Sequence, residues 1–165
     1  MALQAAIRSV EELRERPALA ALLAADPALV AGVCFDRGEL TITVPSHLLR
    51  EACRLLREPE AASFRVLADI TCVDLLPAEP RFAMIYSLLS HERHERLRLK
   101  SLLHSAHLTI DSLTPLWPGA ASFEREVFDL FGVRFQGHPD LRRILLPEDW
   151  EGHPLRKDYP VEGYR

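Results

Sequence analysis

Charged side chains that could act as acids, bases or ion-pair partners are concentrated in the last third of the chain. The densest cluster is Glu124-Arg125-Glu126, with Asp129 about one helical turn later and His138 further along. Carboxylates and a histidine are the groups that carry out general acid–base catalysis, provided that their side chains converge on one point. The same residue types could instead form ion pairs that hold one segment of the chain against another.

The position of each charge on a helix decides between these two uses. A helix is expected at about residues 118–131, and its apolar side chains fill one arc of a helical projection: Phe123, Val127, Phe128, Leu130 and Phe131. Glu124 falls within this arc and is expected to be buried. Arg125, Glu126 and Asp129 project to the opposite side, where Arg125 and Asp129 are spaced for an i,i+4 ion pair. Because the carboxylates diverge, the sequence predicts no catalytic residue in this chain.

The segment after the helix is expected to be extended but ordered. Gly132 is the predicted C-cap, because glycine adopts a left-handed backbone most easily. Four prolines exclude a long helix from residues 133–165, and leucine and aromatic residues are too frequent there for a flexible linker. A buried Glu124 without partners would cost several kcal/mol. The cations expected to pair with it lie in this segment: Arg142, Arg143 and Arg156.

Residues 133–165 form the predicted C-terminal tail, and its charges are balanced. Six cations (Arg134, Arg142, Arg143, Arg156, Lys157, Arg165) stand against six acids (Asp140, Glu148, Asp149, Glu151, Asp158, Glu162). Such balance suits ion pairs that fix the register of an interface better than long-range electrostatic steering. Two interpretations stay open: the tail wraps a partner subunit, or it folds back on its own sheet.

Other kinds of site are not expected. The turn at residues 91–95 lacks two histidines four residues apart on a helix, so no metal site is predicted there. The three cysteines lie far apart and form no Cys-x-x-Cys pair, which argues against a disulfide framework or an iron–sulfur cluster. No glycine-rich loop follows a predicted strand, so this chain is not expected to bind a nucleotide or another cofactor.

Composition and charge narrow the class of protein. The chain has 165 residues, of which 48% are hydrophobic and 27% charged, and its net charge is −4. That length fits one domain, and the acidic balance argues against nucleic acid as a partner. No apolar run approaches the ~18 residues of a membrane span. The N-terminus lacks the pattern of a signal peptide, so a cytoplasmic location is expected.

The elements that position the charged cluster indicate an α+β fold over residues 1–132. Ser9 is expected to cap a helix that Pro17 interrupts and restarts, and Ser46 to cap a second helix. Apolar patterning predicts five strands: 30–35, 39–44, 64–72, 82–90 and 96–100. We expect a sheet of four to five mainly antiparallel strands with helices packed on one face. The fourth strand is apolar on both sides and should be central, whereas the fifth should be an edge or half-exposed strand.

The charged cluster and the tail together resemble a known family. They are similar to the C subunit of proton-pumping NADH:quinone oxidoreductase (respiratory complex I), which has a signature of charged residues at fixed spacing. The signature reads Glu-Arg-Glu, two residues, Asp, two apolar residues, six residues, His, three residues, Arg, one residue and an apolar residue. It is filled here by Glu124, Arg125, Glu126, Asp129, Leu130, Phe131, His138, Arg142 and Ile144. The stretches Leu116-Trp117-Pro118-Gly119-Ala120 and Pro154-Leu155-Arg156-Lys157-Asp158-Tyr159-Pro160 are also similar to this family. Ser122 departs from it, because tryptophan often stands at that position.

The resemblance implies an accessory subunit without redox chemistry of its own. Family members lie in the peripheral arm and support other subunits, which hold FMN, iron–sulfur clusters and quinone. Electrons from NADH pass through those subunits to quinone, and their transfer drives proton translocation. The chain ends just past the tail, as expected for the unfused form of the subunit.

The same resemblance implies where the chain acts and with what. Its partners would be the large quinone-module subunit and the iron–sulfur subunits, on the cytoplasmic side of the inner cell membrane, with membrane contact only through the complex. The residues implied at subunit interfaces are Glu124, Arg125, Glu126, Asp129, Gly132, His138, Arg142, Arg143, Arg156, Lys157 and Asp158.

Two alternatives stay open from the sequence. Ferredoxin-, F420- and hydrogenase-linked relatives of complex I contain an equivalent subunit, so the electron donor is inferred from the commonest member. A stand-alone acid–base enzyme would use Glu126, Asp129 and His138.

Overall fold

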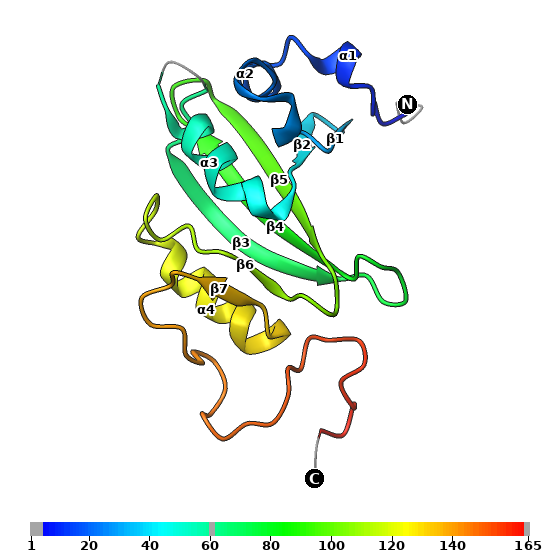
Figure 1. Cartoon of the computed structure of the whole chain (residues 1–165), viewed down its shortest axis with the longest axis vertical. Coiled ribbons are helices and arrows are strands. Elements are labelled where there is room, and N and C mark those ends of the chain that lie inside the picture. Colours follow the sequence, from blue (N-terminus) through cyan, green and yellow to red (C-terminus); the bar gives the residue numbers. More distant parts are fainter. Residues whose placement is uncertain (1–4, 60–61, 164–165) are drawn as a thin grey trace.

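The computed structural model describes residues 5–59 and 62–163, and Figure 1 shows their arrangement. The strands are β1 (Gly32–Asp36), β2 (Glu39–Thr43), β3 (Val66–Asp74), β4 (Phe82–Ser90), β5 (Glu95–Leu103), β6 (Thr109–Asp111) and β7 (Arg134–Gln136). The helices are α1 (Val10–Leu13), α2 (Pro17–Ala25), α3 (Leu49–Arg57) and α4 (Ala120–Phe131), with short 3-10 turns at Pro27–Leu29 and Ser46–Leu48.

Five strands form the main sheet, in the order β1-β2-β5-β4-β3. Neighbouring strands are antiparallel except β2 and β5, which are parallel. β6 and β7 form a separate parallel pair. The predicted α+β fold with a mainly antiparallel sheet is therefore confirmed. β5 is not an edge strand, because it lies between β2 and β4, but its residues do alternate between buried and half-buried.

Helix starts at the N-terminal end follow local chemistry. The hydroxyl of Ser9 accepts a hydrogen bond from the Glu12 N–H and caps α1, and Pro17 occupies the first turn of α2, as predicted. The expected cap at Ser46 is wrong. A 3-10 turn begins there, and α3 starts at Leu49 without a side-chain cap.

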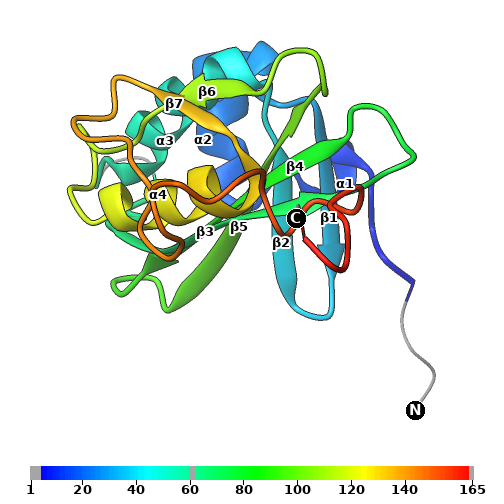
Figure 2. The same ribbon diagram turned by 90° about the horizontal axis from the view of Figure 1, so that it is seen from below.

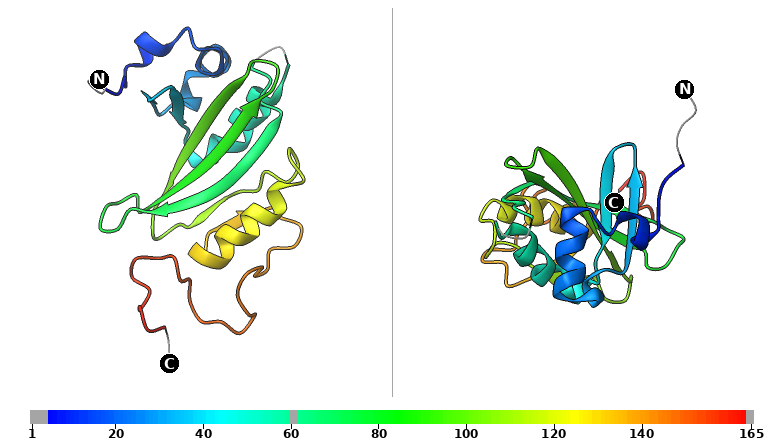
Figure 3. Two further views of the ribbon diagram at one scale, coloured as in Figure 1. Left: turned by 180° about the vertical axis from the view of Figure 1, so that it is seen from behind. Right: turned by 90° about the horizontal axis from the view of Figure 1, so that it is seen from above.

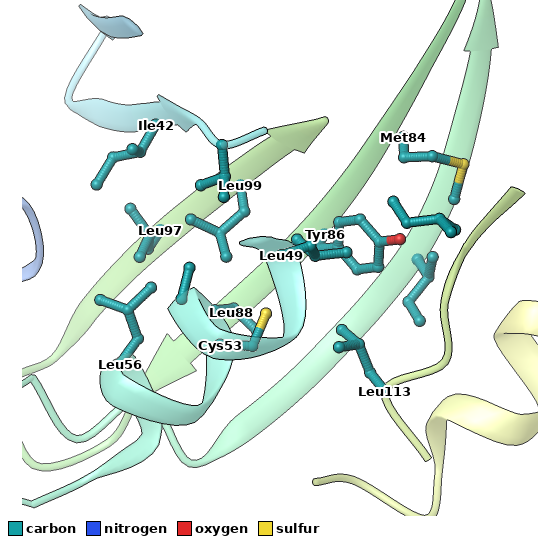
Figure 4. Close-up of a cluster of buried hydrophobic side chains, with 14 of the residues drawn as sticks. Ile42, Leu49, Cys53, Leu56, Met84, Tyr86, Leu88, Leu97, Leu99 and Leu113 are labelled. Atoms are coloured by element: carbon teal, nitrogen blue, oxygen red, sulfur yellow. The ribbon is translucent and has the colours of Figure 1, made fainter. Parts of the chain in front are cut away.

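One apolar core fills the space between the main sheet and its helices. α3 is strongly amphipathic and directs Leu49, Cys53 and Leu56 onto Tyr86 and Leu88 of β4 (Figure 4). Burial raises the pKa of the Cys53 thiol, which fits a small apolar role for this residue. The predicted packing of helices on one face is confirmed, because in the view from behind the strands lie in front of α3 (Figure 3).

α4 packs on the same side of the sheet, next to β3. Trp117, just before the helix, donates its indole N–H to the Arg65 carbonyl at the start of β3. α4 ends at Gly132, whose φ of 76° is left-handed, so the predicted helix and its glycine C-cap are confirmed. The chain then turns into β7 and pairs with β6, which fixes both ends of α4.

The tail runs back along α4 after β7. Residues 137–163 form turns and bends without a helix or strand, and Figure 2 shows this segment crossing the end of the molecule in front of α4. α1 and α2 lie at the opposite end (Figure 1). Among the described residues, α4 is the longest helix at 12 residues, and none has the length and apolar character needed to cross a membrane.

Candidate functional site: the contact between α4 and the tail

Glu124 is fully buried on the inner side of α4, as its place in the apolar arc predicted. Its carboxylate accepts hydrogen bonds from the Leu113 backbone N–H and the Ser112 hydroxyl, both at 2.6 Å. Burial raises the pKa of Glu124, and these two hydrogen bonds act in the opposite direction. Glu124 therefore ties α4 to the loop that connects it to β6.

The prediction that tail arginines pair with Glu124 is wrong. Arg143 and Arg156 donate to carbonyl groups near the C-terminal end of α4, and Arg142 donates to Asp140. Glu124 instead faces the inner side, where neutral donors reach it first. Neutral donors stabilise a buried carboxylate charge only in part. Burial therefore remains the largest influence on the pKa of Glu124 and raises it.

Asp129 accepts several hydrogen bonds from the tail. Its Oδ2 accepts hydrogen bonds from three consecutive backbone N–H groups, those of Ile144 (3.0 Å), Leu145 (2.8 Å) and Leu146 (2.9 Å). Its Oδ1 accepts a hydrogen bond from Arg143 Nη1 at 2.6 Å. Burial works against the charge, but these four donors outweigh it and lower the pKa of Asp129.

The predicted outward position of Asp129 is therefore wrong. Its side chain is fully buried, because the tail covers the side of α4 that the sheet leaves open. A helical projection locates only the face that packs on the sheet, and Asp129 lies beneath a second layer. The i,i+4 pair of Asp129 with Arg125 is wrong for the same reason, since Arg143 occupies the carboxylate.

Arg143 connects Asp129 to the next turn of the tail. Besides the carboxylate, it reaches the Asp129 carbonyl at 3.1 Å, the Trp150 carbonyl at 2.7 Å and the Gly152 carbonyl at 3.0 Å. One guanidinium therefore fixes α4, residue 150 and residue 152 relative to one another. Lysine, with three donors and no planar group, lacks this geometry.

The start of the tail is held by Arg125 and His138. Arg125 donates to the carbonyls of Arg142 and Arg143, at 3.1 and 2.8 Å. The Asp140 N–H donates to His138 Nδ1 at 3.0 Å, so the proton of the ring lies on Nε2, which donates to the Ala121 carbonyl at 3.1 Å. His138 therefore joins the tail to the first turn of α4.

The end of the tail is held by an arginine of the main sheet. Arg81 makes two hydrogen bonds to buried Asp74, with lengths of 2.9 and 2.6 Å, and two to Asp158, with lengths of 2.8 and 2.6 Å. These bonds lower the pKa of both carboxyl groups. Lys157 adds its backbone N–H to Asp74 and its Nζ to the Leu76 carbonyl.

Gly132 is required by close contact as well as by its backbone angle. Arg156 donates from Nε to the Phe131 carbonyl at 2.6 Å, and His153 Nδ1 lies 2.9 Å from the Asp129 carbonyl. A Cβ at position 132 would collide with the Arg156 guanidinium and come within 2.5 Å of His153 Nε2. The tail thus packs directly on the cap of α4, and burial there lowers the pKa of His153 and of Arg156.

We call six of the charged residues that join the tail to the domain the latch residues: Asp74, Arg81, Asp129, Arg143, Arg156 and Asp158. Asp74, Arg81, Ser112 and His153 were not among the predicted site residues. The burial of Asp74 could have been predicted from the sequence, because it follows Ile70 and Cys72 at every second position of β3, on the buried side of the strand. The contact of His153 could not have been predicted in this way, because the tail is irregular and its side chains do not alternate at a regular spacing.

The geometry does not bring together an acid–base site. Asp129 is enclosed by four donors, His138 bridges the tail to the start of α4, and Glu126 is exposed on the outer side of the helix. Within the described residues, no group of three His, Cys, Asp or Glu side chains has the arrangement of a metal site. In this structure these charged side chains hold the backbone of the tail against α4 and the main sheet.

Comparisons with known proteins agree with the resemblance read from the sequence. A family model described as respiratory-chain NADH dehydrogenase, 30 Kd subunit, matches residues 42–165. The C subunit of the NADH-quinone oxidoreductase of Geobacter sulfurreducens is 48% identical over 128 residues, which cover 77% of this chain and 78% of that protein. The same subunit of Roseiflexus castenholzii is 46% identical over 143 residues, covering 87% and 82%.

Two solved structures share the fold. One is Nqo5, described as a trypsin-resistant fragment (1-134), with a TM-score of 0.57 and 34% identity, covering 63% of this chain and 83% of that one. The other is a chain of the membrane-bound sulfane sulfur reductase, an archaeal respiratory membrane complex, with a TM-score of 0.73 and 25% identity, covering 92% and 85%. On the family model and the identity to its relatives, the chain belongs to the family of the 30 Kd subunit of respiratory-chain NADH dehydrogenase, which is the C subunit of bacterial NADH-quinone oxidoreductases.

Proposed function

We propose that this chain is a non-redox structural subunit in the peripheral arm of a NADH:quinone oxidoreductase. One observation carries the proposal: the family match over residues 42–165 includes all of α4, the tail and every latch residue. The relatives that match over most of their length are named as the C subunit of NADH-quinone oxidoreductase. The chain would therefore take part in quinone reduction as a component of an assembly.

The contacts of the charged residues support a structural role. Asp129 and Arg143 direct their polar atoms at each other and at backbone groups of the tail, which leaves them no free face for a substrate. Arg81 is likewise saturated by two carboxylates. A catalytic acid or base needs access to the reacting atom, and these groups lack it.

The finer assignments extend this proposal. We infer that FMN, iron–sulfur clusters and quinone are bound by partner subunits, and that the large quinone-module subunit and the iron–sulfur subunits are the neighbours of this chain. We also infer a position on the cytoplasmic side of the membrane, reached only through the complex. The latch residues are used in internal contacts, which fits a support for other subunits.

A second candidate has its own observation. The chain of the sulfane sulfur reductase complex superposes on 92% of this chain with a TM-score of 0.73, so the same scaffold serves a respiratory membrane complex with another name and another chemistry. The equivalent role for this chain would be in a ferredoxin-, F420- or hydrogenase-linked complex. The identity to that chain is 25% against 48% for the Geobacter relative, which favours the NADH-linked assembly.

The test is to recover the chain from its own cells with a tag and identify the co-purifying proteins by mass spectrometry. Recovery of NADH- and FMN-binding subunits together with a large quinone-module subunit is expected, along with NADH:quinone reductase activity in the eluate. Recovery with a nickel-site hydrogenase subunit or a ferredoxin-oxidising subunit, and without NADH-binding subunits, would instead support the second candidate. Recovery of the chain alone would refute both.

A further inference from the structure

The tail leaves several large apolar side chains partly exposed. Trp150 is 39% exposed, Leu145 60% and Leu155 53%, whereas the apolar residues of the main core are almost completely buried. Large apolar side chains left exposed on a surface segment are typical of a protein–protein contact. Trp150 is the largest of them, and tryptophan is among the residues that most often dominate the binding energy of an interface.

Residues 147–152 hold this tryptophan in a fixed turn. The backbone N–H of Trp150 donates to the Pro147 carbonyl at 3.1 Å, which closes the turn. Arg143, itself bound to Asp129, donates to the carbonyls of Trp150 and Gly152 at 2.7 and 3.0 Å. The backbone on both sides of the indole is therefore set before any partner arrives, and such preorganisation lowers the conformational cost of binding.

The charge of this turn differs from that of the tail as a whole. Four tail cations donate to groups of this chain: Arg142, Arg143, Arg156 and Lys157. Glu148, Asp149 and Glu151, which flank the tryptophan, are exposed and pair with no cation within the part of the chain that the structure describes. The residues that flank Trp150 in the sequence therefore carry three exposed negative charges.

We propose that residues 147–152 are an anchor that inserts Trp150 into an apolar pocket, rimmed by lysine or arginine, on a neighbouring subunit of the complex. This inference rests on the proposed function, because it assumes an assembly with such a neighbour. The acids around the indole would give orientation and association rate, and the indole would give most of the affinity. An acidic rim disfavours nucleic acid and anionic lipid as occupants, because both repel it.

The experiment compares tagged variants of the full chain in cells that lack the untagged copy. Trp150→Ala removes the anchor, and Val10→Ala is its control, because Val10 is 36% exposed at the other end of the molecule. Glu148→Lys/Asp149→Lys reverses the rim charge, and Glu12→Lys/Glu15→Lys reverses two exposed charges near α1 as its control. The complex is bound through the tag and washed with rising NaCl, and the retained partner subunits are quantified by mass spectrometry.

The expected result separates the two parts of the anchor. Trp150→Ala should reduce the retained partner subunits at least ~10-fold at every salt concentration, as for the loss of an interface hot spot. Glu148→Lys/Asp149→Lys should release them at a lower NaCl concentration than its control does, because rim charges are screened by salt. Both control variants should behave like the wild type.

Two failures are distinguishable. If the wild-type chain retains its partners and both anchor variants match their controls, the anchor is refuted while the proposed function stands. If the wild-type chain retains no quinone-reductase subunits at all, the proposed function fails first. Urea unfolding of the purified variants shows whether a loss of partners follows from unfolding of the chain. Glu148→Lys/Asp149→Lys changes only exposed positions, so it should fold normally and still test the anchor if Trp150→Ala does not fold.

Discussion

Asp129 of α4 and Arg143 of the tail face each other across the boundary between domain and tail, with Arg143 Nη1 2.6 Å from Asp129 Oδ1. The Asp129 side chain is fully buried, and the Arg143 side chain is 15% exposed. Both are also bonded to tail backbone, so the pair organises the tail rather than only joining two side chains.

Asp129→Asn should destabilise the purified chain by about 3–5 kcal/mol, because it leaves Arg143 buried without its counter-charge. The pKa of Asp129 is lowered in the folded state, so its contribution is present above the ordinary value of about 3.9 and is lost as pH falls below it. Urea unfolding from pH 7 down to pH 3 should therefore show the difference between wild type and variant shrinking in acid. Asp140→Asn is the control, since its pair with Arg142 is exposed and should contribute at most about 1 kcal/mol.

Glu124→Gln should show the opposite pH trend. Burial raises the pKa of Glu124 in the folded state, so the folded chain holds a proton over the range between the ordinary value of about 4.3 and the raised one. Stability of the wild type relative to Glu124→Gln should fall as pH rises through this range and stay constant above it. Urea unfolding of both proteins from pH 4 to pH 8 measures this difference. A relative stability that grows with pH would mean that the charged form is the favoured one.

Gly132→Ala should lower the stability of the chain by more than the strain of a left-handed backbone alone. Gly132 and Gly38 both have positive φ, at 76° and 86°, but only Gly132 has other side chains where a Cβ would lie. Gly38→Ala should therefore lose about 1–2 kcal/mol, and Gly132→Ala should lose distinctly more, because Arg156 and His153 must move. Thermal unfolding of the two variants makes the comparison, and equal losses would contradict the close packing of the tail on the helix cap.

Arg81→Lys should loosen the end of the tail while keeping the charge. Lysine cannot make bidentate bonds to Asp74 and Asp158 together, so we expect a loss of about 1.5–3 kcal/mol, the size of hydrogen bonds to charged groups. Limited trypsin treatment should also cut the tail of this variant faster. Arg98→Lys is the matched control, because the Arg98–Glu39 pair is about 40% exposed on both sides and should change little. Equal cutting of both variants would argue against this latch.

Local chemistry made α4 and its cap predictable. Apolar side chains recur at helical spacing from Phe123 to Phe131, and Gly132 follows where a left-handed residue is needed. The burial of Glu124 followed from the same pattern. Its partners did not, because a projection of one helix contains no information about the loop at Ser112 and Leu113.

Non-local contacts explain the remaining errors. The burial of Asp129 depends on three backbone N–H groups at residues 144–146, and backbone donors carry no sequence signature. The interior place of β5 depends on β2 pairing with it in parallel across more than fifty residues of chain, which an alternating pattern alone does not reveal. The wrapping of a partner by the tail stays a prediction.

We propose that Asp129 and the other latch residues hold the tail in place and that the chain itself performs no chemistry. The most direct test of this proposal is the NADH:quinone reductase activity of Asp129→Asn per amount of assembled complex, with Glu126→Gln, altered at an exposed position, as the control. We predict that Asp129→Asn lowers the amount of assembled complex several-fold while the activity of each assembled complex stays at the wild-type value. A normal amount of complex with its activity lost would contradict this proposal and point to a direct role of Asp129 in the reaction.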